Sequence, residues 1–205
     1  MSTFAEFLTD TARKGEAVNI LFEERLFDLV GILHRISQSL LVANVPHELI
    51  GGLAVLVHVE EADPAHSMLT RDVDLLVRRE DLERIKDAAH HEGFRFRHTA
   101  GVDMLLYGDT VSARNAVHLL FSGEKVKPSQ ETVNPPIAPE KKSILGQEVM
   151  VIALGDLVRM KLSSYRLKDQ VHVQVMDAAG LITPFVEQQL TPELLRRLRH
   201  VRETD

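Results

Sequence analysis

The chain has 205 residues, of which 44% are hydrophobic and 26% are charged, and its formal net charge is −6. This balance predicts a globular protein with one sizeable core, and the negative charge argues against a surface that coats nucleic acid. The absence of cysteine excludes disulfides and thiolate zinc sites. No apolar run reaches the roughly 18 residues of a membrane span, and the first residues lack the apolar segment of a signal peptide. We therefore expect a cytoplasmic protein with no membrane partner.

The chain opens with a predicted helix. Apolar residues recur at three- and four-residue spacing between Ala17 and Leu41, which favours helix over residues 2 to about 43. After Pro46, the run HELI predicts a short strand that ends at Gly51-Gly52. The following run, LAVLVHVEE, is rich in β-branched residues and by propensity favours a strand, with a helix as the alternative.

Strands and helices alternate through the middle of the chain. DVDLLV predicts a strand, and a helix begins near Glu80 and ends at Gly93. FRFRH and VDMLLY predict strands around a turn at Ala100-Gly101, AVHLLF predicts another strand, and SILGQEVMVI predicts a hairpin that turns at Gly146.

The last third contains one irregular stretch and two helical regions. Residues 122–142 hold four prolines and little that could pack, so this long loop is either functional or disordered. Asp156 is predicted to cap a helix that can run on to Gly180. Thr191-Pro192-Glu193 is a strong helix start, and the basic run LLRRLRHVRE after it predicts a surface helix or a docking face for RNA or a protein partner.

This pattern predicts an α/β (α+β) fold with a mixed sheet flanked by helices. We divide the chain into three parts. An N-terminal helical segment (1–45) packs on an α/β core (46–155), and a C-terminal helical segment (156–205) follows.

Two aspartates at the start of a predicted strand carry the first chemical signal. Side chains two residues apart on a strand point to one face, so Asp72 and Asp74 share a face with Thr70, about 6.5–7 Å apart along the chain. Two carboxylates placed this way can bind Mg²⁺ for phosphoryl or nucleotidyl transfer. The alternative is a pair of solvent-facing acids at a strand end.

The second signal is the glycine pair about twenty residues earlier. Gly51 and Gly52 let the backbone bend sharply and let a phosphate approach the amides of the turn. Alone, such a pair is most often just a turn. A strand, a glycine pair and then Asp-x-Asp on the next strand give an anion cradle followed by a metal clamp.

At these residues the sequence resembles the nucleotidyltransferase-fold (polymerase-beta-like) superfamily, and within it the small bacterial nucleotidyltransferases of the abortive-infection toxin type. The resemblance covers residues 47 to about 180 and rests on short motifs. These are Gly51-Gly52-Leu53-Ala54, Thr70-Arg71-Asp72-Val73-Asp74, Lys161 and Arg166-Leu167-Lys168-Asp169. It implies that LAVLVHVEE is a helix, against its propensity.

The resemblance implies a role for each matched residue. Asp72 and Asp74 would be catalytic and would hold magnesium or manganese. Lys161 would take part in catalysis and in phosphate binding. The nucleotide-binding residues would be Gly51, Gly52, Thr70, Lys161 and Lys168. As alternatives, Lys161 extends along a helix surface, and Lys168 forms a solvated pair with Asp169.

The sequence departs from the family pattern at the third carboxylate. The strand expected to carry this carboxylate has His118 as its polar residue. His118 can act as a general base, since its pKa lies near neutrality, or be a core histidine bonded to a carbonyl. Asp103 is the alternative third acid. Manganese or zinc tolerates an imidazole ligand better than magnesium does. His172 can point into the cleft or face solvent.

Two functions follow from these residues. The first is a metal-dependent transfer of a nucleoside monophosphate from a nucleoside triphosphate to a hydroxyl on RNA, a protein or a small molecule, with release of pyrophosphate. The second is a catalytically degenerate relative that binds a nucleotide or a partner, as in a toxin–antitoxin pair. Residues 1–43 can also support homodimerisation in either case.

Overall fold

We describe the protein from a computed structural model, which describes residues 24–66, 70, 72–108 and 116–204. The helix expected over residues 2–43 is described from residue 24 and continues to residue 42. The expected part before residue 24 lies outside the described residues. Among the described helices, none combines the length and apolar character needed to cross a bilayer.

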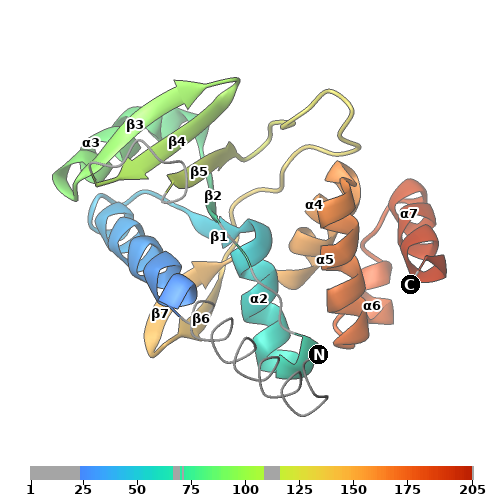
Figure 1. Ribbon diagram of the computed structural model, residues 1–205. Coiled ribbons are helices and arrows are strands. Elements are labelled where there is room, and N and C mark those ends of the chain that lie inside the picture. Colours follow the sequence, from blue (N-terminus) through green and yellow to red (C-terminus); the bar gives the residue numbers. More distant parts are fainter. Residues whose placement is uncertain (1–23, 67–69, 71, 109–115, 205) are drawn as a thin grey trace, which may run out of the picture.

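A mixed sheet of seven strands organises the described chain (Figure 1). The strands are β1 (Glu48–Ile50), β2 (Val73–Val77), β3 (Phe94–Thr99), β4 (Val102–Tyr107), β5 (Ala116–Phe121), β6 (Glu140–Ile144) and β7 (Gln147–Val151). Their order across the sheet is β3-β4-β5-β2-β1-β7-β6. β2 runs antiparallel to β1 and parallel to β5. The end of β1 and the starts of β2 and β5 therefore lie side by side at the same edge of the sheet.

Some helices pack on the sheet, and others form a group on one side of it. They are α2 (Gly51–Ala62), α3 (Leu82–His91), α4 (Leu154–Ser164), α5 (Leu167–Ala178), α6 (Pro184–Glu187) and α7 (Pro192–Glu203), with 3₁₀ turns at Pro64–His66 and Arg79–Asp81. Figure 1 shows α4 to α7 gathered into a helical lobe beside the sheet. The helix of residues 24–42 lies beside α3, because Ser39 Oγ donates to the Ala88 carbonyl at 2.7 Å.

The run after the glycine pair is helix α2, as the resemblance implied, and the strand favoured by propensity is wrong. Eight successive residues, 52–59, are buried. A helix that is apolar on all sides is one that is buried on all sides. α2 packs against β2 on one side and against α4 and α5 on the other, and this enclosure outweighs the β propensity of its valines.

The helix expected to run from Asp156 toward Gly180 is two helices. α4 begins at Leu154, with Ala153 as its N-cap, so Asp156 lies in the first turn and does not cap the helix. α4 ends where Tyr165 takes a left-handed conformation, with φ of 51°. This break separates α4 from α5, and the two helices pack against each other.

The final helix α7 starts as predicted, because Thr191 Oγ1 accepts a hydrogen bond from the Leu194 amide at 3.3 Å. Much of its basic character already has partners within the protein. Arg197 donates to the Leu162 and Ser163 carbonyls at the end of α4, both at 2.9 Å, and Arg202 pairs with Asp177. These contacts hold α7 against α4 and α5.

Candidate active site

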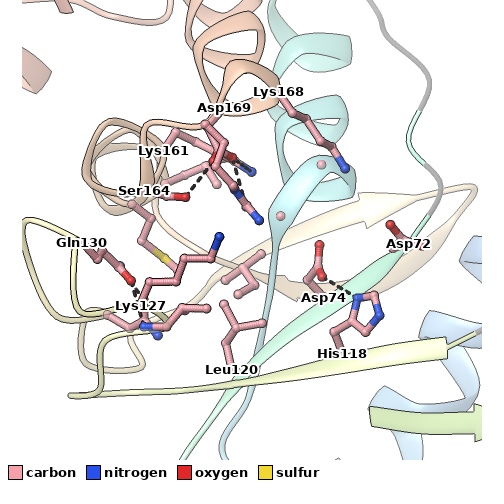
Figure 2. A pocket seen from close by; sticks show the side chains of 18 of the residues that line it. Asp72, Asp74, His118, Leu120, Lys127, Gln130, Lys161, Ser164, Lys168 and Asp169 are labelled. Carbon is pink, nitrogen blue, oxygen red and sulfur yellow. Dashed lines mark hydrogen bonds and ion pairs between the residues drawn. The ribbon is translucent and has the colours of Figure 1, made fainter. Parts of the chain in front are cut away.

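A cavity of about 320 Å³ lies between the sheet and the helical lobe (Figure 2). Its lining comes from the β1–α2 turn, β2 and the residue before it, the start of β4, β5, the loop between β5 and β6, α4 and the start of α5. Of the predicted site residues, the cavity lining includes Gly51, Gly52, Asp72, Asp74, His118, Lys161 and Lys168. Residues spread over more than a hundred positions of the sequence therefore come together at one site.

The glycine pair is required by close packing against the acidic strand. Gly51 has φ of +74°, and a Cβ atom there would lie 1.9 Å from Asp74 Oδ2. A Cβ on Gly52 would lie 2.6 Å from Thr70 Oγ1. The pairing of Ile50 with Asp74 in the sheet sets this approach. Only residues without side chains let the start of α2 lie directly against the carboxylate of Asp74.

The N-terminus of α2 has the properties of an anion-binding site. Its N-cap residue is Ile50, which offers no side-chain hydrogen bond to the first turn, and the first turn contains no acid. The first amide groups of a helix have no partner within the helix and carry a partial positive charge. Because Gly51 and Gly52 line the cavity, these amides are placed to bind phosphate oxygens next to Asp74.

Asp72 and Asp74 both line the cavity, as their spacing predicted. The Asp74 side chain is 21% exposed, and its Oδ1 is 3.1 Å from His118 Nδ1. The parallel pairing of β2 with β5 sets Asp74 directly beside His118. The hydrogen bond to Asp74 and the charges of Asp74 and Asp72 raise the pKa of His118 above its ordinary value, although burial opposes this shift. His118 is thus a partner of Asp74 and not a core histidine bonded to a carbonyl.

Asp103, the alternative third acid, is on the wrong face of the sheet. It is paired with Leu119, while His118 is paired with Met104, so Asp103 and His118 point in opposite directions. Asp103 binds Arg79 Nη1 at 2.9 Å and also contacts His98. The strand register, which the sequence did not reveal, removes Asp103 from the site.

The helical wall of the cavity is organised around Asp169, whose side chain is 1% exposed. Its carboxylate accepts hydrogen bonds from Ser164 Oγ at 2.7 Å and Arg166 Nε at 2.8 Å, and it lies 3.4 Å from Lys161 Nζ. Burial by itself raises the pKa of Asp169. The hydrogen bond from Arg166, the charge of Lys161 and the bond from Ser164 outweigh burial and hold this pKa below its ordinary value. The alternative of a solvated Lys168-Asp169 pair is therefore wrong for Asp169.

The two predicted lysines differ in environment. Lys161 is buried against Asp169, and burial lowers its pKa despite the opposing charges of Asp169 and Asp74. Lys161 therefore does not extend along a helix surface. Lys168 is exposed at the cavity, makes no ion pair with the described residues, and its charge acts on both His118 and Lys161. Lys168 is the more available of the two for a new anion.

His172 and Thr70 lie next to Gly52 at the start of α2. His172 is buried, which corrects the alternative that it faces solvent, and a Cβ on Gly52 would lie 3.5 Å from its Cε1. Burial, together with the charges of Lys161 and Lys168, lowers the pKa of His172 to about 3, so the ring is neutral. Thr70 is also buried and is not among the described residues that line the cavity. Its contact with a nucleotide stays a prediction.

Sequence reasoning missed the contribution of the β5–β6 loop, residues 122–139. The expectation that it has little to pack is wrong, because Gln130 and Asn134 are buried in it. Asn134 Nδ2 donates to the Phe121 carbonyl at 3.0 Å, and Gln130 Oε1 accepts from the Val126 amide at 2.8 Å. The available signal was the length of the loop, which pointed to function without pointing to particular residues.

The residues present fit a magnesium or manganese ion that is bound together with a substrate. In the described part of the chain, no group of three or more His, Asp or Glu side chains is placed to hold a metal alone. Mg²⁺ commonly takes one or two carboxylates, substrate phosphates and water. Asp72 and Asp74 beside the anion-binding start of α2 supply this kind of site.

Comparison with known proteins identifies the fold. No protein-family model and no curated protein match the sequence. The solution structure of the antibiotic-resistance factor ANT(2'')-Ia is similar, with a TM-score of 0.54 and 14% identity over 85% of this chain and 91% of that chain. An antigenic nucleotidyltransferase-like protein from Paracoccidioides brasiliensis gives 0.55 and 18% identity, over 86% and 88% of the two chains.

A third similar structure is the Megavirus polyadenylate synthase, with a TM-score of 0.54 and 9% identity over 89% of this chain and 39% of the synthase. Together these structures show that the chain has the nucleotidyltransferase fold, as the sequence motifs predicted. At these identities the likeness defines the fold alone. The nearer resemblance to abortive-infection toxin nucleotidyltransferases stays a prediction.

Proposed function

We propose that the protein is a metal-dependent nucleotidyltransferase that moves a nucleoside monophosphate from a nucleoside triphosphate to a hydroxyl acceptor and releases pyrophosphate. One observation carries the proposal: the start of α2 lies against Asp74 so closely that a Cβ on Gly51 would be 1.9 Å from the carboxylate. The arrangement brings phosphate-binding amides and metal-binding carboxylates to one point. A nucleoside triphosphate with its divalent cation needs both of these at once.

The charged residues and the glycines of the cavity each have a part in this proposal. Asp72 and Asp74 would hold the cation, which when bound supplies charge neutralisation and polarises the α-phosphate. The amides of Gly51 and Gly52 would bind phosphate oxygens, and Lys168 would neutralise further charge. Lys161, held by Asp169, would support the same phosphates from the helical wall.

The reaction would be an in-line displacement at the α-phosphorus. A bond forms between the acceptor oxygen and phosphorus, and the bond from phosphorus to the bridging oxygen of the β-phosphate breaks. Pyrophosphate leaves with the bonding electron pair, and the acceptor proton passes to His118 or to solvent. Positioning and charge stabilisation would supply most of the rate enhancement.

A second function keeps the nucleotide site without the chemistry. It is favoured by His118, which stands where the family carries a third carboxylate and is hydrogen-bonded to Asp74. In this case the protein binds a nucleotide or a protein partner, as one component of a toxin–antitoxin pair does. A cytoplasmic location and a homodimer, both expected from the sequence, would be compatible with either function.

Release of pyrophosphate separates the two functions. The full chain is incubated with each of the four nucleoside triphosphates, with Mg²⁺ or Mn²⁺, and with RNA, protein and small-molecule acceptors. The proposed enzyme releases pyrophosphate only when a divalent cation and an acceptor are present. Metal-dependent nucleotide binding without turnover under all conditions would select the binding function, and no nucleotide binding would exclude the enzyme and the nucleotide-binding form of the second function.

A further inference from the structure

The loop between β5 and β6 places a lysine in the cavity that no motif of the sequence pointed to. Lys127 lines the cavity, and Figure 2 shows its side chain extending from the loop into it. Lys127 makes no ion pair with the described residues, in contrast to Arg166 and Lys161, which are bound to Asp169. An unpaired ammonium group at a partly enclosed site is available for an anionic ligand.

The loop around Lys127 is built to hold its shape. Val126 and Gln130, on either side of Lys127, are joined by the hydrogen bond from the Val126 amide to Gln130 Oε1. Gln130 Nε2 then donates to Asn134 Oδ1 at 3.2 Å, and Asn134 is bound to the end of β5. At its far side the loop is joined to α4, because the Thr132 amide donates to Ser163 Oγ at 2.8 Å. Lys127 therefore projects from a loop that is anchored on two sides.

The position of Lys127 relative to the other charged groups indicates which anion it meets. Figure 2 shows Lys127 and Lys161 toward one end of the cavity and His118 and Asp72 toward the other, with Asp74 between them. In an in-line displacement, the entering acceptor and the leaving group lie on opposite sides of the α-phosphorus. If His118 lies at the acceptor side, the leaving group lies at the end that holds Lys127.

We propose that Lys127 binds the pyrophosphate part of the nucleoside triphosphate, on the side of the cavity opposite His118. This inference rests on the proposed function and adds a residue to it. Lys127 would contact the β- or γ-phosphate from the loop, while Lys161 and Lys168 approach from the helical lobe. The charge that accumulates on pyrophosphate as it leaves would then meet an ammonium group that makes no ion pair within the described part of the chain.

The test measures binding of inorganic tripolyphosphate with Mg²⁺ to the full chain by calorimetry, because this probe has the phosphates without a nucleoside. Lys127→Ala is compared with Lys125→Ala, an exposed lysine of the same loop that is not among the described lining residues. Both variants remove one positive charge at exposed positions, so both should fold. We expect Lys127→Ala to weaken tripolyphosphate binding about 5- to 20-fold, and Lys125→Ala to change it less than twofold.

Two further measurements locate the contact. Lys127→Arg keeps the charge and should restore most of the binding. The matching nucleoside monophosphate, which lacks the β- and γ-phosphates, should bind Lys127→Ala and the unchanged protein equally well. The inference is overturned if Lys127→Ala binds tripolyphosphate like the unchanged protein, or if both alanine variants lose the same amount.

The same experiment separates this inference from the proposed function. If the unchanged protein binds tripolyphosphate and nucleoside triphosphates with Mg²⁺ and Lys127→Ala does the same, only the role of Lys127 fails. If the unchanged protein binds neither ligand, the proposed function and the role of Lys127 fail together.

Discussion

The two walls of the cavity carry opposite charges and hold them in different ways. On the sheet wall, Asp74 is partly exposed and has one described hydrogen-bond partner, His118. On the helical wall, the carboxylate of Asp169 is buried. It accepts hydrogen bonds from Arg166 and Ser164 and forms an ion pair with Lys161. The sheet wall thus presents acids to the cavity, and the helical wall presents cations.

This difference shows that the same residue type can have two uses a short distance apart. A carboxylate surrounded by donors stabilises structure and has little capacity left for a ligand. A carboxylate with few partners beside another acid costs stability and gains from a cation. Experiments that treat the two kinds of acid alike should therefore give opposite results.

The largest expected effect concerns the sheet wall. The double substitution Asp72→Ala and Asp74→Ala should lower pyrophosphate release at least about 1,000-fold, because it removes both metal ligands. The melting temperature should stay the same or rise, since two like charges are lost. Asp103→Asn, on the opposite face, is the control and should keep metal-dependent nucleotide binding. Unchanged nucleotide binding in the double variant would contradict the proposed function.

The next effect concerns the helical wall. Asp169→Asn should lower the free energy of unfolding by about 3 kcal/mol, because Lys161 and Arg166 lose a buried partner. Asp177→Asn breaks a more exposed pair with Arg202 and should cost about 1 kcal/mol or less. Denaturant unfolding measures both. Equal losses would show that Asp169 is not the centre of this wall.

A smaller effect tests the contact between the glycine pair and Asp74. Gly51→Ala should cost about 2 kcal/mol more than Gly101→Ala in denaturant unfolding. Both glycines have φ near +75°, so the backbone strain is matched, but a Cβ at Gly101 meets nothing within 4 Å. The excess cost therefore reports the collision with Asp74. No difference between the two variants would mean that the start of α2 does not lie against the carboxylate.

The smallest effect concerns Glu48, a buried glutamate of β1. Glu48 is buried, with Oε2 accepting from the Ala138 amide at 3.0 Å, and burial together with Asp156 raises its pKa from 4.5 to about 7. Between pH 4.5 and 7 the unfolded chain loses this proton first, so stability falls as the pH rises through that window. Above pH 7 the loss is complete.

Glu48→Gln removes this titration. The variant should be more stable than the unchanged protein by on the order of 1–2 kcal/mol at pH 8, and the difference should become small at pH 5. Unfolding in urea at several pH values measures it. A stability difference that does not change with pH would show that Glu48 is not buried as a protonated acid.

Local sequence signals predicted much of the fold. The strand ending at Gly51, the turn at Ala100-Gly101 and the helix start at Thr191 follow from short-range rules of backbone conformation and capping, and each is found in the structure. The helix α2 was predicted only through the family resemblance. Its valines favour a strand in isolation, and burial on all sides decided otherwise.

The site was predicted in part for a similar reason. Asp74 lies in β2 and Asp72 directly precedes that strand, and both line the cavity; their spacing of two residues was the signal in the sequence that pointed to them. The anchoring of Lys161 by Asp169 depends on the break at Tyr165, and the exclusion of Asp103 depends on strand register. Neither is a local property.

The sequence by itself determined the chemical groups and their local order: a glycine turn at a helix start, and two carboxylates at the entry to the next strand. Tertiary structure alone decided which other groups face them, placing His118 beside Asp74, turning Asp103 away and bringing Lys127 into the cavity. The physical reason is that alternation and helix capping act over a few residues. Strand register, burial and loop anchoring depend on contacts between segments far apart in the chain.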